Sequence, residues 1–277
     1  MIRTLRTLAP AKLNTFLAVG PPDRIGYHPL RTIFRTISLA DEVVVTTGGS
    51  GKITVDGMDL PAENTLTKAM RFVREIASLP AHDIHVVKRI PAQAGLGGGS
   101  SDAAAYLRIA NHLSGGQIPV HELSAIAQSI GADVSFFLVG GAAKGEGYGE
   151  ILTPIDHEPM RHLVVVMPSG VTCSTPEMYK ALDSTSREFA AFPGDPWTLY
   201  NDFERVAPCE CLDGIERLQV FGASAAGLTG SGAAYFGVVR DADEAAPMAA
   251  RAQEEGLGAA WAVTTLGPAS ATVVSEG

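Results

Sequence analysis

The sequence is short of the features that mark secreted and membrane-bound proteins. Its 277 residues include three cysteines, Cys173, Cys209 and Cys211, with no CxxC pair. An odd number of cysteines is typical of reduced thiols inside the cell. No apolar run approaches the roughly 20 residues of a membrane span, and the N-terminal stretch has no apolar core of signal-peptide length. We therefore expect a cytoplasmic protein that does not enter a membrane.

Positive charge is also scarce. The chain has 21 Lys and Arg against 30 Asp and Glu, which gives a net charge of −9. This acidic balance argues against a protein whose main function is to bind nucleic acid or an anionic membrane, but it is compatible with a local phosphate-binding pocket. Apolar residues make up 46% and charged residues 18% of the chain, as is normal for a globular protein. A chain of this length can bury a core without disulfides or a structural metal.

The pattern of apolar residues predicts strands and helices that alternate along the chain. The expected strands are 4–19, 32–47, 83–90, 163–167, 234–240 and 260–265, with 52–56 as a short hairpin partner. The expected helices are 64–78, a helix ending at 113, 120–130, 175–182, 196–207, 211–221 and 242–256, and 131–149 is expected to be loop and short strand. This order predicts an α+β fold in two lobes, residues 1–157 and 158–277.

Glycine is plentiful, at 30 of 277 residues, and its densest cluster is the PAQAGLGGGSSDAA segment that begins at Pro91. A strand is expected before it and an Ala-rich helix after it, so free N–H groups at the helix start can bind phosphate. Ser100 and Ser101 could cap the helix or donate to phosphate, and we expect a positive φ at Gly98, in the middle of the loop. The alternative is a flexible linker with an N-cap serine. The segment lacks GxxxxGK[ST] and the third glycine of GxGxxG, which disfavours a Walker A or dinucleotide site.

Three further segments carry chemistry-bearing residues. Lys12 and Asn14 lie two apart in an expected strand and therefore share a face, and a cation in so apolar a strand needs an anionic partner. Asp133 precedes the apolar run 134–139, where it could also be a turn or cap carboxylate at a strand edge. The GLTGSG segment at 227–232 could support the phosphate loop or form a tight turn.

Together these segments resemble a known family. PAKLN at 10–14, the PxxxGLGGGSSxAA pattern from 91 and TGSG at 229–232 are similar to the three motifs of the GHMP small-molecule kinases, in the same order and spacing. GYH at 26–28, GADVSFFL, GEGYGEIL, GVTCSTPEMYKALD and NDFE resemble the branch whose members phosphorylate a cytidine-diphosphate-linked methylerythritol. The resemblance covers nearly the whole chain. Two positions depart from it: Ile25 stands where Asp usually precedes GYH, and Arg35 where Gln is common.

The resemblance implies an N-terminal ATP-binding and catalytic domain of ribosomal-protein-S5-like fold and a C-terminal ferredoxin-like domain, with the active site in the cleft between them. It implies transfer of the γ-phosphoryl group of ATP, with Mg²⁺, to the 2-hydroxyl of the cytidylyl substrate. That reaction is a step of the non-mevalonate route to isoprenoid precursors. The expected partners are these small molecules, with no nucleic acid, and the expected protein is a monomer or homodimer.

The resemblance also implies roles for particular residues. Asp133 would be the general base, and Lys12 would stabilise charge. Asn14, Tyr27, His28, Thr175 and Tyr179 would bind the cytidine substrate. The resemblance does not identify the protein ligands of Mg²⁺, and Ser101 is only a weak candidate. The ATP-binding residues would be Asn64 and the loop Pro91, Ala92, Gln93, Ala94, Gly95, Leu96, Gly97, Gly98, Gly99, Ser100 and Ser101.

Three alternatives stay open. A sister kinase acting on homoserine or mevalonate would share the loops but not the GYH and TPEMY segments. A catalytically dead nucleotide-binding module would normally lack Lys12 or Asp133, and both are present. An NAD-dependent oxidoreductase is disfavoured by the broken glycine fingerprint.

Overall fold

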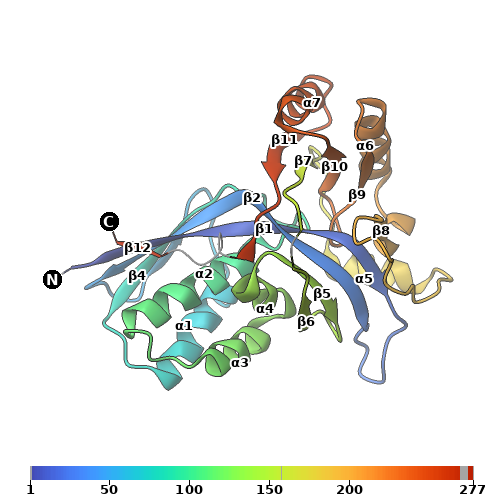
Figure 1. The fold of residues 1–277 in the computed structure, drawn as a ribbon. Coiled ribbons are helices and arrows are strands. Elements are labelled where there is room, and N and C mark those ends of the chain that lie inside the picture. Colours follow the sequence, from blue (N-terminus) through green and yellow to red (C-terminus); the bar gives the residue numbers. More distant parts are fainter. Residues whose placement is uncertain (1, 157, 269–273, 277) are drawn as a thin grey trace.

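Two antiparallel strands, β1 (Thr4–Val19) and β2 (Leu30–Thr47), run through most of the molecule (Figure 1). The computed structural model describes residues 2–156, 158–268 and 274–276. Within them the first sheet has the main order β12-β1-β2-β4-β3, while β5 pairs with β2 and β6, and β8 pairs with β1. The shorter strands are β3 (Ile53–Val55), β4 (His82–Val87), β5 (Ala142–Glu146), β6 (Ile151–Pro154), β8 (Tyr200–Asn201) and β12 (Ser275–Glu276).

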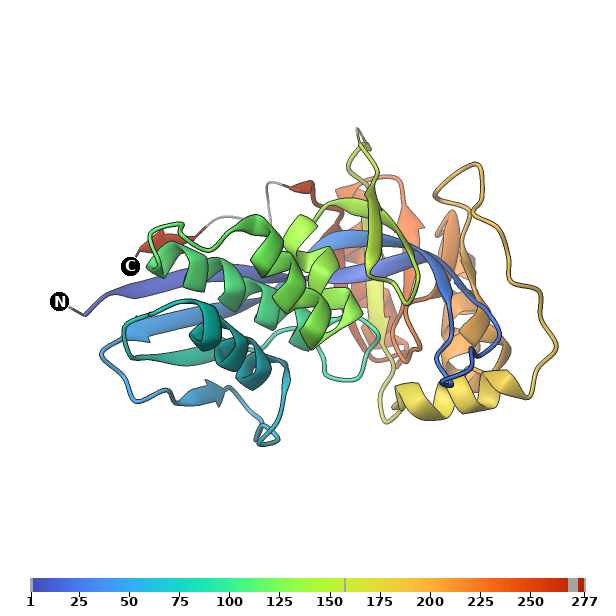
Figure 2. The same cartoon turned by 90° about the horizontal axis from the view of Figure 1, so that it is seen from below.

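Four helices gather on one side of this sheet, as Figures 1 and 2 both show. Their apolar faces meet the sheet in one core, which includes Leu5, Val43, Ile84 and the Ala-rich side of α2. The side chain of Asn64 caps α1 by accepting from the backbone N–H of Thr67. The helices are α1 (Thr65–Ile76), α2 (Gly98–Leu113), α3 (Val120–Ile130) and α4 (Ala132–Val139).

A second sheet, of order β11-β7-β10-β9, forms the other lobe and packs against α6 and α7. An apolar cluster that joins Leu13 of β1 and Ile37 of β2 to Val165 of β7 and Phe236 of β10 ties the two sheets together. Within the described ranges, every helix is too short or too polar to span a bilayer. The elements are β7 (His162–Met167), α5 (Thr175–Asp183), the 3₁₀ helix η1 (Asp202–Arg205), α6 (Cys209–Val220), β9 (Ala225–Leu228), β10 (Tyr235–Val239), α7 (Ala242–Glu254) and β11 (Ala259–Thr264).

The predicted α+β class is confirmed, but three local predictions are wrong. The apolar run after Asp133 forms the helix α4 instead of loop and strand. Residues 196–207 contain only β8 and η1 instead of a helix. The short strand β3 pairs with β4 in parallel, so it is not a hairpin partner.

Candidate active site

A cleft of about 650 Å³ is lined by residues of both lobes. It brings together many residues that the sequence singles out. Tyr27, His28 and Ser101 lie outside its lining, and their surroundings are described below. The singled-out residues that line it are Lys12, Asn14, Asn64, Pro91, Ala92, Gln93, Ala94, Gly95, Leu96, Gly97, Gly98, Gly99, Ser100, Asp133, Thr175 and Tyr179.

The glycine-rich loop delivers the N-terminus of α2 to this cleft. The N-cap is Gly97, with φ +72°, and no side chain bonds the first N–H groups of the helix. Those donors and the positive end of the 16-residue helix are suited to an anion. The suggested serine cap is therefore wrong. The expected positive φ at Gly98 is also wrong, because Gly95 and Gly97 complete the turn and Gly98 is already the first residue of the helix.

Backbone contacts fix the loop between β1 and the GLTGSG segment. The N–H of Lys12 donates to the carbonyl of Leu96 at 3.0 Å, and the N–H of Ala234 donates to the carbonyl of Ala94 at 3.2 Å. The hydroxyl of Ser101 is fully buried and donates to the carbonyl of Pro10 at 2.7 Å, which anchors the helix start to β1. Gln93 is the non-glycine residue of the loop that has a left-handed backbone, with φ +55°. The loop is thus held rigidly before any ligand enters.

Lys12 and Asn14 share one face of β1, as the period of two predicts, and both are buried. The ammonium of Lys12 donates to Oδ1 of Asn14 at 2.5 Å. The same oxygen accepts from the N–H of Gly230 at 3.0 Å, and the Asn14 side-chain amide donates to the hydroxyl of Thr32 at 2.7 Å. The GLTGSG segment is therefore bonded to β1 through Asn14, and Ala234, two residues after the segment, is bonded to the phosphate loop.

Asp133 enters the cleft from the first turn of α4, where a negative charge interacts favourably with the helix dipole. Burial lowers the pKa of Lys12, and the charge of Asp133 opposes that shift. Burial, with the charge of Asp133 adding to it, raises the pKa of Tyr179 to about 12. Asp133 is therefore electrostatically linked to the β1 cation on one side and to an α5 aromatic on the other.

A cluster of three charged side chains lies beside the loop and was not predicted from the sequence. The ammonium of Lys88 lies 2.5 Å from Oδ2 of Asp41 and 3.0 Å from Oδ2 of Asp102. Burial alone would lower the pKa of Lys88, but the charges of Asp102 and Asp41 outweigh it and the net shift is upward. Both Lys88 and Asp102 line the cleft. The available signal was a lysine three residues before the glycine-rich loop, in the segment KRIP.

Aromatic rings form the α5 side of the cleft. The ring of Tyr179 lies 5.0 Å from the ring of His28 and meets Phe203 edge-on at 4.9 Å. The hydroxyl of Thr175 is 2.9 Å from that of Ser231, which ties α5 to the GLTGSG segment. Phe203 comes from η1, in a region predicted as plain helix, so its place in the lining was also missed.

The turn before GYH shows how Ile25 is accommodated. Asp23 supplies a carboxylate to this turn, and its Oδ1 accepts from the N–H groups of Ile25 and Tyr27, each at 2.9 Å. Its Oδ2 accepts from the hydroxyl of Tyr148 at 2.5 Å. This bond, and to a smaller extent the backbone bonds, lower the pKa of Asp23. Tyr27 is 62% exposed and its ring packs 5.5 Å from that of Tyr148, which lines the cleft. Tyr27 thus borders the cleft through Tyr148.

The second departure, Arg35, lies away from this cleft. Its buried guanidinium pairs with Glu158 and stacks 4.8 Å from the ring of Trp197. Burial lowers the pKa of Arg35, and the charge of Glu158 opposes that shift. Arg35 therefore fastens residues 158 and 197 to β2.

Comparisons with known proteins agree with this geometry. Residues 64–141 match the family model described as the GHMP kinases N terminal domain. The chain is 38% identical over 259 residues to a 4-diphosphocytidyl-2-C-methyl-D-erythritol kinase from Solibacter usitatus, which covers 86% of this chain and 81% of that relative. It is similar to a crystal structure of 4-(cytidine 5'-diphospho)-2C-methyl-D-erythritol kinase, with a TM-score of 0.79 and 33% identity over 95% of this chain and 99% of that one. A homoserine kinase structure from Cytophaga hutchinsonii has a TM-score of 0.67 at 16% identity, over 99% of this chain and 97% of that one, and so shows a shared fold alone.

Proposed function

The chain belongs to the 4-diphosphocytidyl-2-C-methyl-D-erythritol kinase family of GHMP kinases, and from that membership we propose that it moves the γ-phosphoryl group of ATP to the 2-hydroxyl of this cytidylyl substrate. It is an enzyme, a phosphotransferase to an alcohol group. The observation that carries the proposal is a single cleft that holds Lys12, Asp133 and the uncapped start of α2. The proposed division of labour gives ATP binding and catalysis to residues 1–157 and the second lobe to 158–277.

ATP is the co-substrate, and we propose that its phosphates lie against the start of α2. The free N–H groups after Gly97 donate to the phosphate oxygens, and the absence of side chains at Gly97, Gly98 and Gly99 allows close approach. Asn64, at the start of α1, borders the nucleotide. Mg²⁺ bound to the ATP phosphates, whose oxygens are ligands that this ion prefers, would supply neutralising charge at the transferring group.

The transfer step needs a base and a cation more than covalent help. Asp133 accepts the proton of the substrate's 2-hydroxyl as the 2-oxygen of the substrate attacks the γ-phosphorus. The bond from that phosphorus to the β–γ bridging oxygen breaks, and ADP leaves. Lys12 stabilises the negative charge on the transferring phosphoryl group and the attacking oxygen. Asn14 holds the Lys12 ammonium in place at 2.5 Å, so the cation needs no rearrangement during the reaction.

The cytidine end of the substrate lies on the aromatic side of the cleft. Tyr179 offers a ring face for stacking on cytosine, with His28 beside it. Tyr27 closes this end through its contact with Tyr148. Asn14 and Thr175 supply hydrogen-bonding groups between the aromatic end and the phosphate loop.

The best test is an assay of ATP consumption by the purified protein with the cytidylyl substrate, homoserine and mevalonate in parallel. We expect turnover with the cytidylyl substrate alone. Turnover with homoserine or mevalonate and none with the cytidylyl substrate would leave the GHMP kinase fold intact but overturn this function.

Two buried cysteines, Cys173 and Cys211, are compatible with action in the cytoplasm, where thiols stay reduced. We propose that the protein acts there as a monomer or homodimer on these small molecules.

A further inference from the structure

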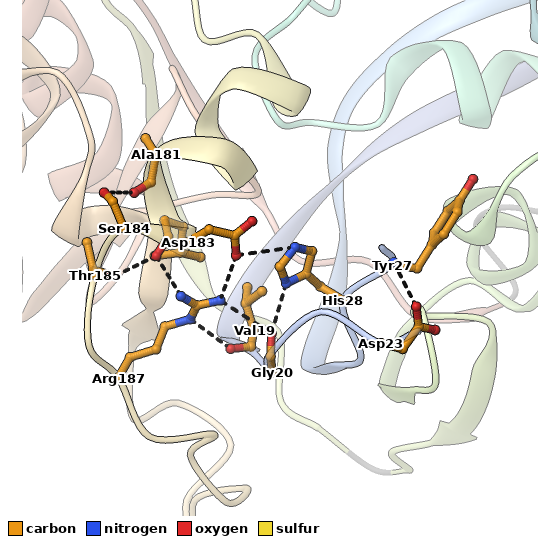
Figure 3. Close-up of polar contacts among 11 residues, drawn as sticks. Val19, Gly20, Asp23, Tyr27, His28, Ala181, Asp183, Ser184, Thr185 and Arg187 are labelled. Carbon is orange, nitrogen blue, oxygen red and sulfur yellow. Dashed lines mark hydrogen bonds and ion pairs between the residues drawn. The ribbon is translucent and has the colours of Figure 1, made fainter. Parts of the chain in front are cut away.

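The imidazole of His28 contacts three protein groups, and Figure 3 shows two of them, the carbonyl of Gly20 and the carboxylate of Asp183. Its side chain is only 7% exposed. Nδ1 lies 2.9 Å from the carbonyl oxygen of Gly20, and because a carbonyl only accepts, Nδ1 carries a hydrogen. The ring centroids of His28 and Tyr179 are 5.0 Å apart. At the other ring nitrogen, Nε2 is 3.5 Å from Oδ1 of Asp183. The ring orientation is therefore set by protein groups before substrate arrives.

Asp183 is the last residue of α5, and its carboxylate lies between His28 and Arg187 (Figure 3). The same Oδ1 atom that faces the imidazole is 3.8 Å from Nη2 of Arg187, four residues further along the chain and beyond the end of α5. This oxygen thus connects the histidine to the Arg187 guanidinium. The Asp183 side chain is 42% exposed, so the pair by itself contributes little to global stability.

Arg187 is built into the backbone around it. Its side chain is 8% exposed. Nε donates to the carbonyl of Val19 at 3.0 Å, Nη1 to that of Leu182 at 2.6 Å and Nη2 to that of Gly20 at 3.3 Å. These three carbonyls belong to the end of β1 and the end of α5. The carbonyl of Gly20 therefore receives both the Arg187 guanidinium and the His28 ring, so a shift of the arginine would be felt at the histidine.

We propose that Asp183 and Arg187 are positioning residues that preset His28 and Tyr179 as a platform for the pyrimidine ring of a cytidine diphosphate ligand. This inference rests on the proposed function. Arg187 clamps the end of β1 to the end of α5, and Asp183 and the Gly20 carbonyl fix the two edges of the imidazole. A preset platform lowers the ordering cost of binding, so these residues act on the affinity for the cytidylyl substrate and not on the chemical step.

Asp183→Asn and Arg187→Lys test the proposal. The first removes the negative charge beside His28 and the second removes the planar guanidinium that donates to three carbonyls, while each keeps a side chain of similar size. We expect each to raise the KM for the cytidylyl substrate on the order of 10-fold, with kcat and the KM for ATP within about twofold of the parent. Calorimetric titration with cytidine diphosphate should show the same loss. Arg240→Lys is the matched control, since Arg240 and Glu244 form an exposed i,i+4 pair remote from the cleft. It should leave all constants unchanged.

A double-mutant cycle separates positioning from general structural damage. In a His28→Phe background, which keeps a ring on Tyr179 but loses both nitrogens, Asp183→Asn should add less than about twofold to KM. A full additional loss there would show that Asp183 does not act through His28 and would overturn the proposal. A fall in kcat with unchanged KM, as a smaller folded fraction produces, would overturn it too. If the parent protein turns over the cytidylyl substrate and both variants match it, the inference alone fails. If the parent does not turn it over, the proposed function fails, and the inference falls with it.

Discussion

Replacement of Gly95 by alanine is the sharpest test of how the phosphate loop is built. A Cβ atom at this position would lie 2.2 Å from the carbonyl oxygen of Thr229 and 3.1 Å from that of Gly232. Both are backbone atoms of the GLTGSG segment, so relief requires the two loops to separate. Gly95 also has φ +73°, a left-handed conformation that disfavours any residue with a side chain. The backbone conformation costs about 1–2 kcal/mol and the overpacking about 1–3 kcal/mol.

We therefore expect Gly95→Ala to lower the free energy of unfolding by about 2–5 kcal/mol and to weaken binding of a non-hydrolysable ATP analogue. Gly98→Ala is the matched control for the effect on stability, not for binding of the analogue. Gly98 is already helical, and its Cβ would lie 3.1 Å from the ammonium of Lys88 and 3.2 Å from Cγ2 of Ile90, so these side chains need to shift by only a few tenths of an ångström. Alanine there gains up to about 1 kcal/mol of helix propensity, so the control should unfold like the parent or later.

Urea unfolding without nucleotide and calorimetric titration with the analogue measure the two effects separately. A Gly95→Ala protein as stable as the parent, with unchanged affinity for the analogue, would refute the close approach of the two loops. Greater destabilisation by Gly98→Ala than by Gly95→Ala would refute the order of conformations along the loop.

Three further predictions follow from the site. Asp133→Asn and Lys12→Ala should each lower kcat by at least ~10²-fold in steady-state assays, while Asp133→Asn keeps its affinity for ATP in calorimetry; near-normal turnover by a folded Asp133→Asn protein would make Asp133 a structural carboxylate. Gln93→Gly should raise the free energy of unfolding by about 1 kcal/mol, since it relieves a left-handed backbone at φ +55°; an unchanged urea midpoint would contradict this. Burial raises the pKa of Asp102 from its ordinary 3.8 to about 7, so the folded protein retains a proton that the unfolded chain releases, and the stability from this group is full at low pH and is lost as pH rises through about 7. The melting temperature of Asp102→Asn minus that of the parent should therefore grow from pH 5 to pH 8, and a constant difference would contradict the raised pKa.

Local patterns were enough to predict elements whose sequence and packing agree. The Thr-, Val-, Ile- and Leu-rich composition of β1 and β2, the apolar face of α1 and the change from glycine to alanine at α2 each favour one kind of element. The run after Asp133 has no such period, because most of α4 is buried on several sides and every position from Val134 to Phe137 is buried. A short apolar run of this kind is equally compatible with a strand.

Tertiary contacts decided the region predicted as a helix at 196–207. The buried carboxylate of Asp202 accepts from the N–H of Val19 at 2.8 Å, and the side-chain amide of Asn201 donates to the carbonyls of Leu228 and Gly230. These partners are far away in sequence. They hold an extended segment where the local residues alone favour a helix.

The candidate site divides in the same way. The shared face of Lys12 and Asn14 follows from the strand period, and the anion-binding helix start follows from the glycines. The link from Asn14 to Gly230 and the pairing of Lys88 with Asp41 and Asp102 join elements that only the folded chain brings together. The bonds from Ile25 and Tyr27 to Asp23 could not be predicted, because they depend on where the turn directs its N–H groups.

The position of the transferred phosphate tests the central claim most directly. Phosphorus NMR of the purified protein with MgATP and 4-diphosphocytidyl-2-C-methyl-D-erythritol reports every phosphate in the mixture. We predict one new phosphomonoester on the 2-oxygen of the erythritol unit, formed as ADP appears, with the substrate diphosphate intact. No new phosphomonoester from this substrate, with homoserine or mevalonate phosphorylated under the same conditions, would contradict it.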